Sequence, residues 1–305
     1  MRKTFIKTLF EEAKKNPKIF LVTGDLGFMA LEEFRDNLPK QFLNIGVAEQ
    51  NLIGFSAGLA LTGKKVYAYS IVPFVTMRPF EQVRDDVCYH NLDVTLVGPG
   101  AGFSYSFNGP THYGLEDISI MRSLPNMTVV CPGDPMEVAA ATKASVKHKG
   151  PMYLRLGKAG EPIIHKNPIN FKIGESIEVL KGKDATLFAT SNLLQNAVEA
   201  GKLLKQKGIN CRVVSMHTIK PLDVEVIKKA AKETKIIFTL EEHSIIGGLG
   251  SAVAEFLAES NYKVKFKRLG VPDVYPKVVG TQIFLRDMFG LSPEKIAAEI
   301  KKFVK

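Results

Sequence analysis

Tryptophan is absent from the 305-residue chain, and cysteine occurs only at Cys88, Cys131 and Cys211. The three cysteines are far apart, and no histidine or further cysteine accompanies them at metal-ligand spacing. This pattern excludes a disulfide framework and a zinc ribbon or finger. We therefore expect reduced thiols, as in a cytoplasmic protein, and no metal ligands on this chain.

Long apolar runs and basic tracts are also missing. No stretch approaches the roughly 18 apolar residues of a membrane helix, and residues 1–17 lack the apolar core and cleavage site of a signal peptide. The formal net charge is +10, but the lysines and arginines are spread along the chain and do not alternate with aromatic residues. The sequence argues against a membrane or nucleic-acid partner and favours anionic metabolites or an acidic partner subunit.

Short apolar segments alternate with amphipathic segments in both halves of the chain, which is typical of parallel sheets covered by helices. Strands are predicted at 19–24, 64–70, 93–98, 127–133, 184–191, 209–216 and 235–243, and helices at 48–61, 79–90, 193–208, 224–235 and 251–260. After Arg155 the alternation stops, and residues 157–175 are rich in Gly, Pro, Asn and Lys. We predict an α/β protein with two doubly wound domains, residues 1–165 and a smaller domain at 181–305, joined by a linker at 166–180.

One carboxylate begins a helix that is otherwise apolar. Glu49 precedes a run of apolar and small residues ending near Leu61. A buried carboxylate must be paired, protonated or functional, because burial disfavours its charged form. The alternative is a capping group stabilised by the helix dipole.

A second candidate lies in the loop 98–117, which is rich in glycine and hydroxyl groups and contains His112. This loop follows a buried strand, and open parallel sheets bind ligands at the carboxyl ends of their strands. His112 has no metal-ligand companion, so its alternatives are a structural histidine or a ligand-binding group.

Several of these segments together resemble the transketolase family. The segment 44–51 contains Glu49 and Gln50, and it is similar to a segment of that family in which a Glu is followed by Gln or His. Further family-like segments follow in the same order, at 80–84, 89–94, 109–112, 115–118, 121–127 and 131–134, and the tail is similar at 241–243 and 247–250. The resemblance covers nearly the whole chain and implies a pyrimidine-binding domain followed by a transketolase C-terminal-like domain.

The family's diphosphate-binding segment, Gly-Asp-Gly, has no counterpart. Gly-Asp occurs only before Leu26 and before Pro135. The resemblance therefore implies a split thiamine-diphosphate enzyme, in which a separate polypeptide supplies the Mg²⁺ and diphosphate site. It also implies an α₂β₂ heterotetramer, since the cofactor lies between the two kinds of domain in this family.

The resemblance assigns cofactor roles to three residues. In the family a Glu hydrogen-bonds the aminopyrimidine ring of thiamine diphosphate and favours its imino tautomer, and Glu49 matches it. Such a Glu has to be protonated or share a proton. Phe74 lies at or next to the aromatic residue that stacks on this ring, or is a core residue after a strand. Asp25 matches an acidic residue near the thiazolium, with a helix cap as the alternative.

Substrate roles follow in the same way. His112 matches a histidine that contacts the donor's hydroxyl and carbonyl region, and Arg155 and Arg2 match arginines that grip the phosphate of sugar phosphates. Asn108 replaces an Asp that selects the configuration of a substrate hydroxyl, and Tyr113 replaces the usual Gln. These departures leave the donor and acceptor open, including a modified sugar from a specialised pathway.

The activity that the resemblance implies is transfer of a two-carbon ketol unit between sugar or sugar-phosphate substrates. Alternatives are the beta subunit of a 2-oxoacid dehydrogenase, a deoxyxylulose-phosphate-synthase-like enzyme and a non-catalytic scaffold. Retention of both Glu49 and His112 argues against the scaffold.

Overall fold

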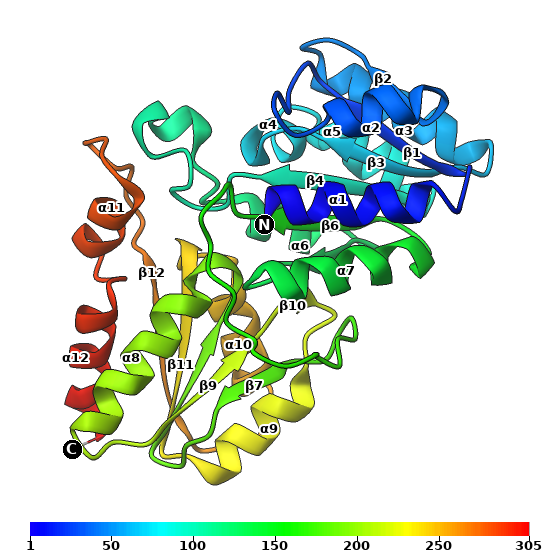
Figure 1. Ribbon diagram of the computed structural model, residues 1–305. Helices are drawn as coiled ribbons and strands as arrows, with labels where there is room; N and C mark the ends of the chain where they lie inside the picture. The colour runs from blue at the N-terminus through cyan, green and yellow to red at the C-terminus, as the bar shows by residue number, and fades with distance from the viewer. Residues whose placement is uncertain (305) are drawn as a thin grey trace.

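The computed structural model describes residues 1–304 and contains two sheets, the first built mainly from the N-terminal half of the chain and the second from the C-terminal half (Figure 1). The first sheet has seven strands in the order β10-β5-β6-β4-β3-β1-β2. All its neighbours are parallel except β10 and β5. Its strands are β1 (Ile19–Thr23), β2 (Phe42–Asn44), β3 (Lys65–Tyr69), β4 (Val94–Pro99), β5 (Thr128–Val130), β6 (Met152–Leu156) and β10 (Thr218–Lys220).

The second sheet has five strands in the order β12-β11-β8-β9-β7, with only β7 antiparallel to its neighbour. These strands are β7 (Ile177–Leu180), β8 (Ala185–Ala189), β9 (Cys211–Ser215), β11 (Ile236–Ser244) and β12 (Lys265–Val271). The predicted class of two α/β units with mainly parallel sheets is confirmed.

Helices cover both faces of the first sheet. Helices α1 (Arg2–Ala13) and α7 (Pro135–Lys147) pack on one face (Figure 1). Helices α3 (Glu49–Leu61) and α6 (Asp117–Ser123) pack on the other. The side chains of β3 alternate between these faces: Val66 and Ala68 join the α3 side, and Tyr67 and Tyr69 the α1 side. A strand buried on both faces has this period of two.

The second sheet packs in the same way. Helices α8 (Leu194–Gln206) and α12 (Pro293–Val304) share one apolar cluster with it. Helices α9 (Val224–Glu233) and α10 (Leu249–Ala258) contribute to the cluster that also contains α3 and α6. The remaining helices are the short α2 (Glu32–Asn37), α4 (Val72–Thr76), α5 (Phe80–Gln82) and α11 (Gln282–Met288). One apolar core therefore runs from the first unit into the second.

The structure differs from the sequence-based expectations at three places. The helix predicted at 79–90 is divided into α5 and a π-helical segment, Val83–Tyr89. Strand β7 lies inside the segment predicted as a linker. Strand β10, from the second half of the chain, extends the first sheet as an antiparallel edge. Both strands are too short to produce a visible alternation of apolar and polar residues in the sequence. They form because each pairs with a neighbouring strand. Over residues 1–304, no helix combines the length and the apolar character that crossing a membrane requires.

Candidate functional site

The site residues gather where the strands of the first sheet end. Asp25 follows β1, Ser70 follows β3, and the loop that carries His112 follows β4. Because these strands are parallel, their carboxyl ends meet at one edge, which is where open α/β sheets bind ligands. Glu49 comes to the same edge as the first residue of α3, after the short strand β2.

Glu49 is 4% exposed and makes two side-chain contacts. Its Oε1 accepts a hydrogen bond from Ser70 Oγ at 3.2 Å, and its Oε2 pairs with Arg78 Nη1 at 2.9 Å. Gly24 lies close by, where an added Cβ would be 3.8 Å from Glu49 Oε1. Arg78 thus places a positive charge beside the nearly buried carboxyl group of Glu49.

Phe74 lies in α4 with a half-buried ring that touches two other site residues. The guanidinium carbon of Arg78 is 3.7 Å from the centroid of the Phe74 ring. The imidazole of His112 meets the same ring at 5.1 Å with an interplanar angle of 67°. Glu49, Arg78, Phe74 and His112 therefore form one continuous group, the Glu49 cluster.

His112 lies in the 3₁₀ turn Pro110–His112, where its Nδ1 is 3.0 Å from the hydroxyl of Thr111. Partial burial lowers the pKa of His112, and the positive charge of Arg78 lowers it further. The imidazole is consequently neutral near pH 7, and it retains one nitrogen that accepts and one that donates a hydrogen bond.

Two cations lie beside the loop that carries His112. The Nζ of Lys158 is 4.5 Å from the centroid of the Tyr105 ring, and that ring is 5.9 Å from the imidazole of His112. Burial raises the pKa of Tyr105, and the nearby charge of Arg2 opposes this. Arg2 was predicted as a phosphate ligand. Lys158 was not singled out from the sequence, although it lies just after β6, at the edge where the strands end.

Asp25 is exposed and has a left-handed backbone, with φ of 57°. It exchanges two hydrogen bonds with Asn44: its backbone N–H donates to Asn44 Oδ1 at 2.9 Å, and its Oδ1 accepts from Asn44 Nδ2 at 2.8 Å. A cavity of about 80 Å³ adjoins both residues. Asp25 does not cap α2, whose N-cap position is Leu31.

The two positions that depart from the family pattern differ in their exposure. Asn108 is exposed at the end of a 3₁₀ turn, Ser106–Asn108. Tyr113 is 2% exposed, donates a hydrogen bond to the carbonyl of Ser106 at 2.6 Å and packs edge to face on Phe103. Asn108 is thus open to a ligand, whereas Tyr113 is a core residue that holds the loop.

Arg155 requires a correction, because the structure contradicts its predicted role as a phosphate ligand. Its side chain is fully buried, and its Nε and Nη2 lie 2.7 and 3.2 Å from the carboxylate oxygens of Asp117. Nη2 also donates to the carbonyls of Gly114, at 2.7 Å, and Glu242, at 3.0 Å. The guanidinium therefore ties the loop before α6 to β11 and does not face a substrate.

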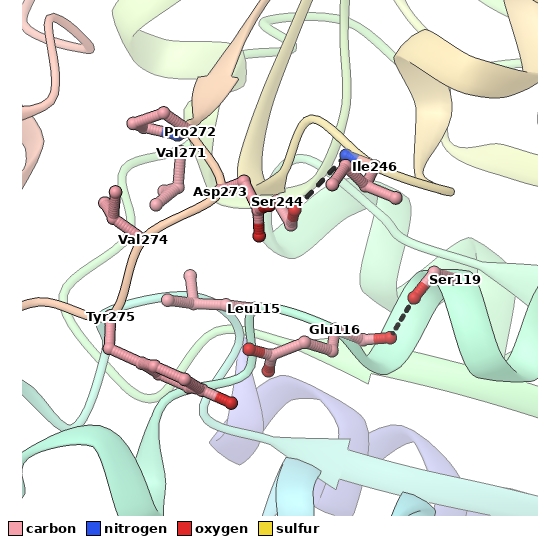
Figure 2. Close-up of a pocket in the computed structure, with 10 residues that line it drawn as sticks. All are labelled: Leu115, Glu116, Ser119, Ser244, Ile246, Val271, Pro272, Asp273, Val274 and Tyr275. Atoms are coloured by element: carbon pink, nitrogen blue, oxygen red, sulfur yellow. Dashed lines mark hydrogen bonds between the residues drawn. The ribbon is translucent and has the colours of Figure 1, made fainter.

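A cavity of about 340 Å³ lies between the start of α6 and the segment 271–275 (Figure 2). Glu116 and Tyr275 lie on one side of it, and Ser244 and Asp273 on the other. Burial raises the pKa of Glu116, and the charge of Asp117 raises it further. None of the lining residues belongs to the Glu49 cluster. Across residues 1–304, no three His, Cys, Asp or Glu side chains come together in a way that would hold a metal ion.

Two family models match the chain: the transketolase pyrimidine binding domain over residues 1–160 and the transketolase C-terminal domain over residues 174–296. The chain is 39% identical over 306 residues to an apulose-4-phosphate transketolase subunit of Phocaeicola vulgatus, covering 100% of this chain and 97% of the relative. It is 37% identical over 297 residues to the 6-deoxy-6-sulfo-D-fructose transketolase subunit of a Clostridium species, covering 97% and 92%.

Other relatives are longer. The 1-deoxy-D-xylulose-5-phosphate synthase of Gloeothece citriformis is 33% identical over 305 residues, which are 98% of this chain but 48% of that protein. Among solved structures, a split gene transketolase described as an inactive beta4 tetramer superposes with a TM-score of 0.91 at 37% identity, covering 99% of this chain and 97% of the other. This chain belongs to the transketolase family and is the subunit that carries the pyrimidine-binding and C-terminal domains of a split, thiamine-diphosphate-dependent enzyme.

Proposed function

We propose that the Glu49 cluster is the half-site through which this subunit takes part in transfer of a two-carbon ketol unit between sugars or sugar phosphates. The observation that carries the proposal is the nearly buried carboxyl of Glu49 at the carboxyl edge of the sheet, within one cluster with Phe74 and His112. A buried carboxylate beside a half-exposed aromatic face and a neutral imidazole suits acid–base work on a planar, nitrogen-containing ring and its substrate.

These residues fit the aminopyrimidine of thiamine diphosphate. Glu49 is positioned by the hydrogen bond from Ser70, and the ring of Phe74 is partly open. When bound, the cofactor supplies the carbon that carries the two-carbon unit. Glu49 would hold or release a proton at a ring nitrogen, Phe74 would orient the ring by stacking, and Asp25 would provide negative charge nearby.

His112 and the exposed residues around it would act on the substrate. The neutral imidazole of His112 would donate a proton to, or accept one from, a substrate hydroxyl or carbonyl oxygen. Asn108 would bind a hydroxyl without adding charge. Arg2 and Lys158, close to Tyr105, would attract an anionic group at the far end of the sugar. The substrate class is therefore a ketose with a terminal phosphate or other anionic group.

The remaining half of the site would come from a second kind of chain. Relatives that match this chain over nearly their whole length are themselves called subunits, and the Gly-Asp-Gly segment is absent from the sequence. We propose that the partner supplies the Mg²⁺ and diphosphate ligands and that the assembly is an α₂β₂ heterotetramer. We also propose two domains, one at 1–165 and a second that begins with β7 (Ile177–Leu180) rather than at residue 181, as the matched ranges 1–160 and 174–296 support.

The decisive experiment combines this chain with its partner subunit, thiamine diphosphate and Mg²⁺, and screens ketose phosphates for transfer of a glycolaldehyde unit to aldose acceptors. Activity that requires both chains and the cofactor supports the proposal. The relatives that are synthases of 1-deoxy-D-xylulose 5-phosphate favour a second candidate, so pyruvate with glyceraldehyde 3-phosphate is screened in parallel. Decarboxylation of a 2-oxoacid with transfer to a lipoyl carrier, and no ketol transfer, would contradict the proposal.

A further inference from the structure

Arg78 makes two contacts at once inside the Glu49 cluster. Its Nη1 pairs with Glu49 Oε2 at 2.9 Å, and its guanidinium carbon lies 3.7 Å from the centroid of the Phe74 ring. Arg78 follows the short helix α4, and 47% of its side chain is exposed. The guanidinium is therefore held by two neighbours on one side and is open to solvent on the other.

These are the two contacts that the proposed function gives to the aminopyrimidine of the cofactor. A guanidinium and an aminopyrimidine are both planar and nitrogen-rich, both can hydrogen-bond a carboxyl group, and both stack on an aromatic ring. The two groups cannot occupy the same face of Phe74 and the same oxygen of Glu49 together. A ring that takes this face and this oxygen can therefore bind only if Arg78 moves.

We propose that Arg78 is a placeholder that occupies the aminopyrimidine position in the cofactor-free subunit and is displaced when the cofactor binds; the inference rests on the proposed function of Glu49 and Phe74. A nearly buried carboxylate without a partner is costly, so the arginine stabilises the free subunit. Its partial exposure keeps the ion pair weak enough to break, because solvent screens the attraction.

The test measures cofactor affinity rather than activity. Calorimetry follows the titration of thiamine diphosphate, with Mg²⁺, into the complex of this chain and its partner. The Arg78→Met variant keeps the length of the side chain but removes the charge and the planar group. It should bind thiamine diphosphate about three- to tenfold more tightly, since the competing ion pair and stacking contact are gone.

Two further variants sharpen the result. Arg78→Lys keeps the charge without the planar stack, so its affinity should fall between those of the wild type and Arg78→Met. Arg84→Met is the matched control, because Arg84 is 64% exposed and pairs with Asp85 on the neighbouring π-helical segment. Its affinity should equal that of the wild type. The difference in affinity for thiamine diphosphate between the wild type and Arg78→Met should become smaller in high salt, because salt screens exposed ion pairs.

Equal or weaker binding by Arg78→Met would overturn the placeholder, because Arg78 would then be neutral toward the cofactor or would help to hold it. A wild-type complex that assembles but binds no thiamine diphosphate would instead refute the proposed function, and the placeholder with it. Tight binding by the wild type together with loss of binding in Arg78→Met would leave the proposed function standing and remove only this inference.

Discussion

The imidazole of His112 packs edge to face against the ring of Phe74, with their centroids 5.1 Å apart. The two residues come from different strand ends: Phe74 follows β3, and His112 lies in the long loop after β4. An aromatic edge-to-face contact restricts the plane of the imidazole. Because Nδ1 of His112 lies 3.0 Å from the hydroxyl of Thr111, Nε2 is the nitrogen that we expect to act on a substrate.

For this reason we expect His112→Asn to lower kcat by about 10²- to 10⁴-fold, the range for loss of a general acid or base. Thiamine diphosphate should still bind with nearly unchanged affinity, because Glu49 and Phe74 are intact. Steady-state kinetics and calorimetry on the complex with the partner subunit measure the two effects. His90→Asn is the control, since His90 is exposed and contacts only Tyr89 among the aromatic residues described. A kcat within a factor of about two of wild type would remove His112 from the mechanism.

Replacing Glu49 by Gln keeps the size of the side chain and removes its acid–base chemistry. We expect turnover to fall by at least about 10²-fold while the subunits still associate. Size-exclusion chromatography checks association, and initial rates check turnover. Glu81→Gln, an exposed position on α5, provides the matched control and should retain wild-type rates. Near-full activity of Glu49→Gln would refute the central assignment.

We expect the charge of Arg78 to influence the pKa of His112 even without the cofactor. Burial first, and then this positive charge, lowers the pKa of His112, because protonation would place a second cation nearby. In Arg78→Met the pKa of His112 should therefore rise toward the ordinary value of about 6.5. Titration of the imidazole C–H resonances by NMR in the isolated chain gives the answer. An unchanged pKa would mean that Arg78 and His112 are not close in solution.

The correction of Arg155 leads to a prediction about stability. Arg155→Met leaves Asp117 as a buried carboxylate without its ion-pair partner. Breaking a buried pair in this way costs about 3–5 kcal/mol in the free energy of unfolding. Denaturant unfolding measures the loss, and Arg35→Met, which breaks an exposed pair with Asp36, should leave the free energy of unfolding nearly unchanged. Unchanged stability with a strongly raised KM for sugar phosphates would restore the phosphate-binding role.

We predict that His243 makes the free energy of unfolding sensitive to acid. Burial lowers the pKa of His243 to about 4, from 6.5 in a free side chain. The unfolded chain therefore binds a proton more readily, so stability is lost as pH falls from 6.5 toward 4. Between about pH 7 and pH 5 the loss is on the order of 2 kcal/mol.

The measurement compares the free energy of unfolding of the wild type and His243→Gln at both pH values. The comparison is needed because burial raises the pKa of the neighbouring Glu241 to about 7. The folded chain holds that proton more tightly than the unfolded chain, so the contribution of Glu241 declines as pH rises and opposes that of His243. The variant should be less sensitive to acid than the wild type. Equal sensitivity of the two proteins would show that His243 is not buried in its neutral form.

The sequence by itself determined the class of fold, the family and the place of Glu49. Alternating apolar segments specify strands and helices locally, since burial on a sheet or helix face imposes a period of two or about 3.6 residues. The order of the short motifs along the chain identified the transketolase family and the split organisation. Glu49 was predicted at a helix start, and it is the first residue of α3.

Only the tertiary structure decided which side chains meet. Arg78 and Phe74 are four residues apart on the chain, but Arg78 reaches Glu49, 29 residues away, only because the start of α3 and the residues after α4 come together at one edge of the sheet. Arg155 carries a charge that suggested a ligand, yet it lies inside β6, where Asp117 and a carbonyl of β11 compensate its burial. Contacts between distant segments depend on how whole elements pack, whereas sequence periodicity reports only which face of one element is buried.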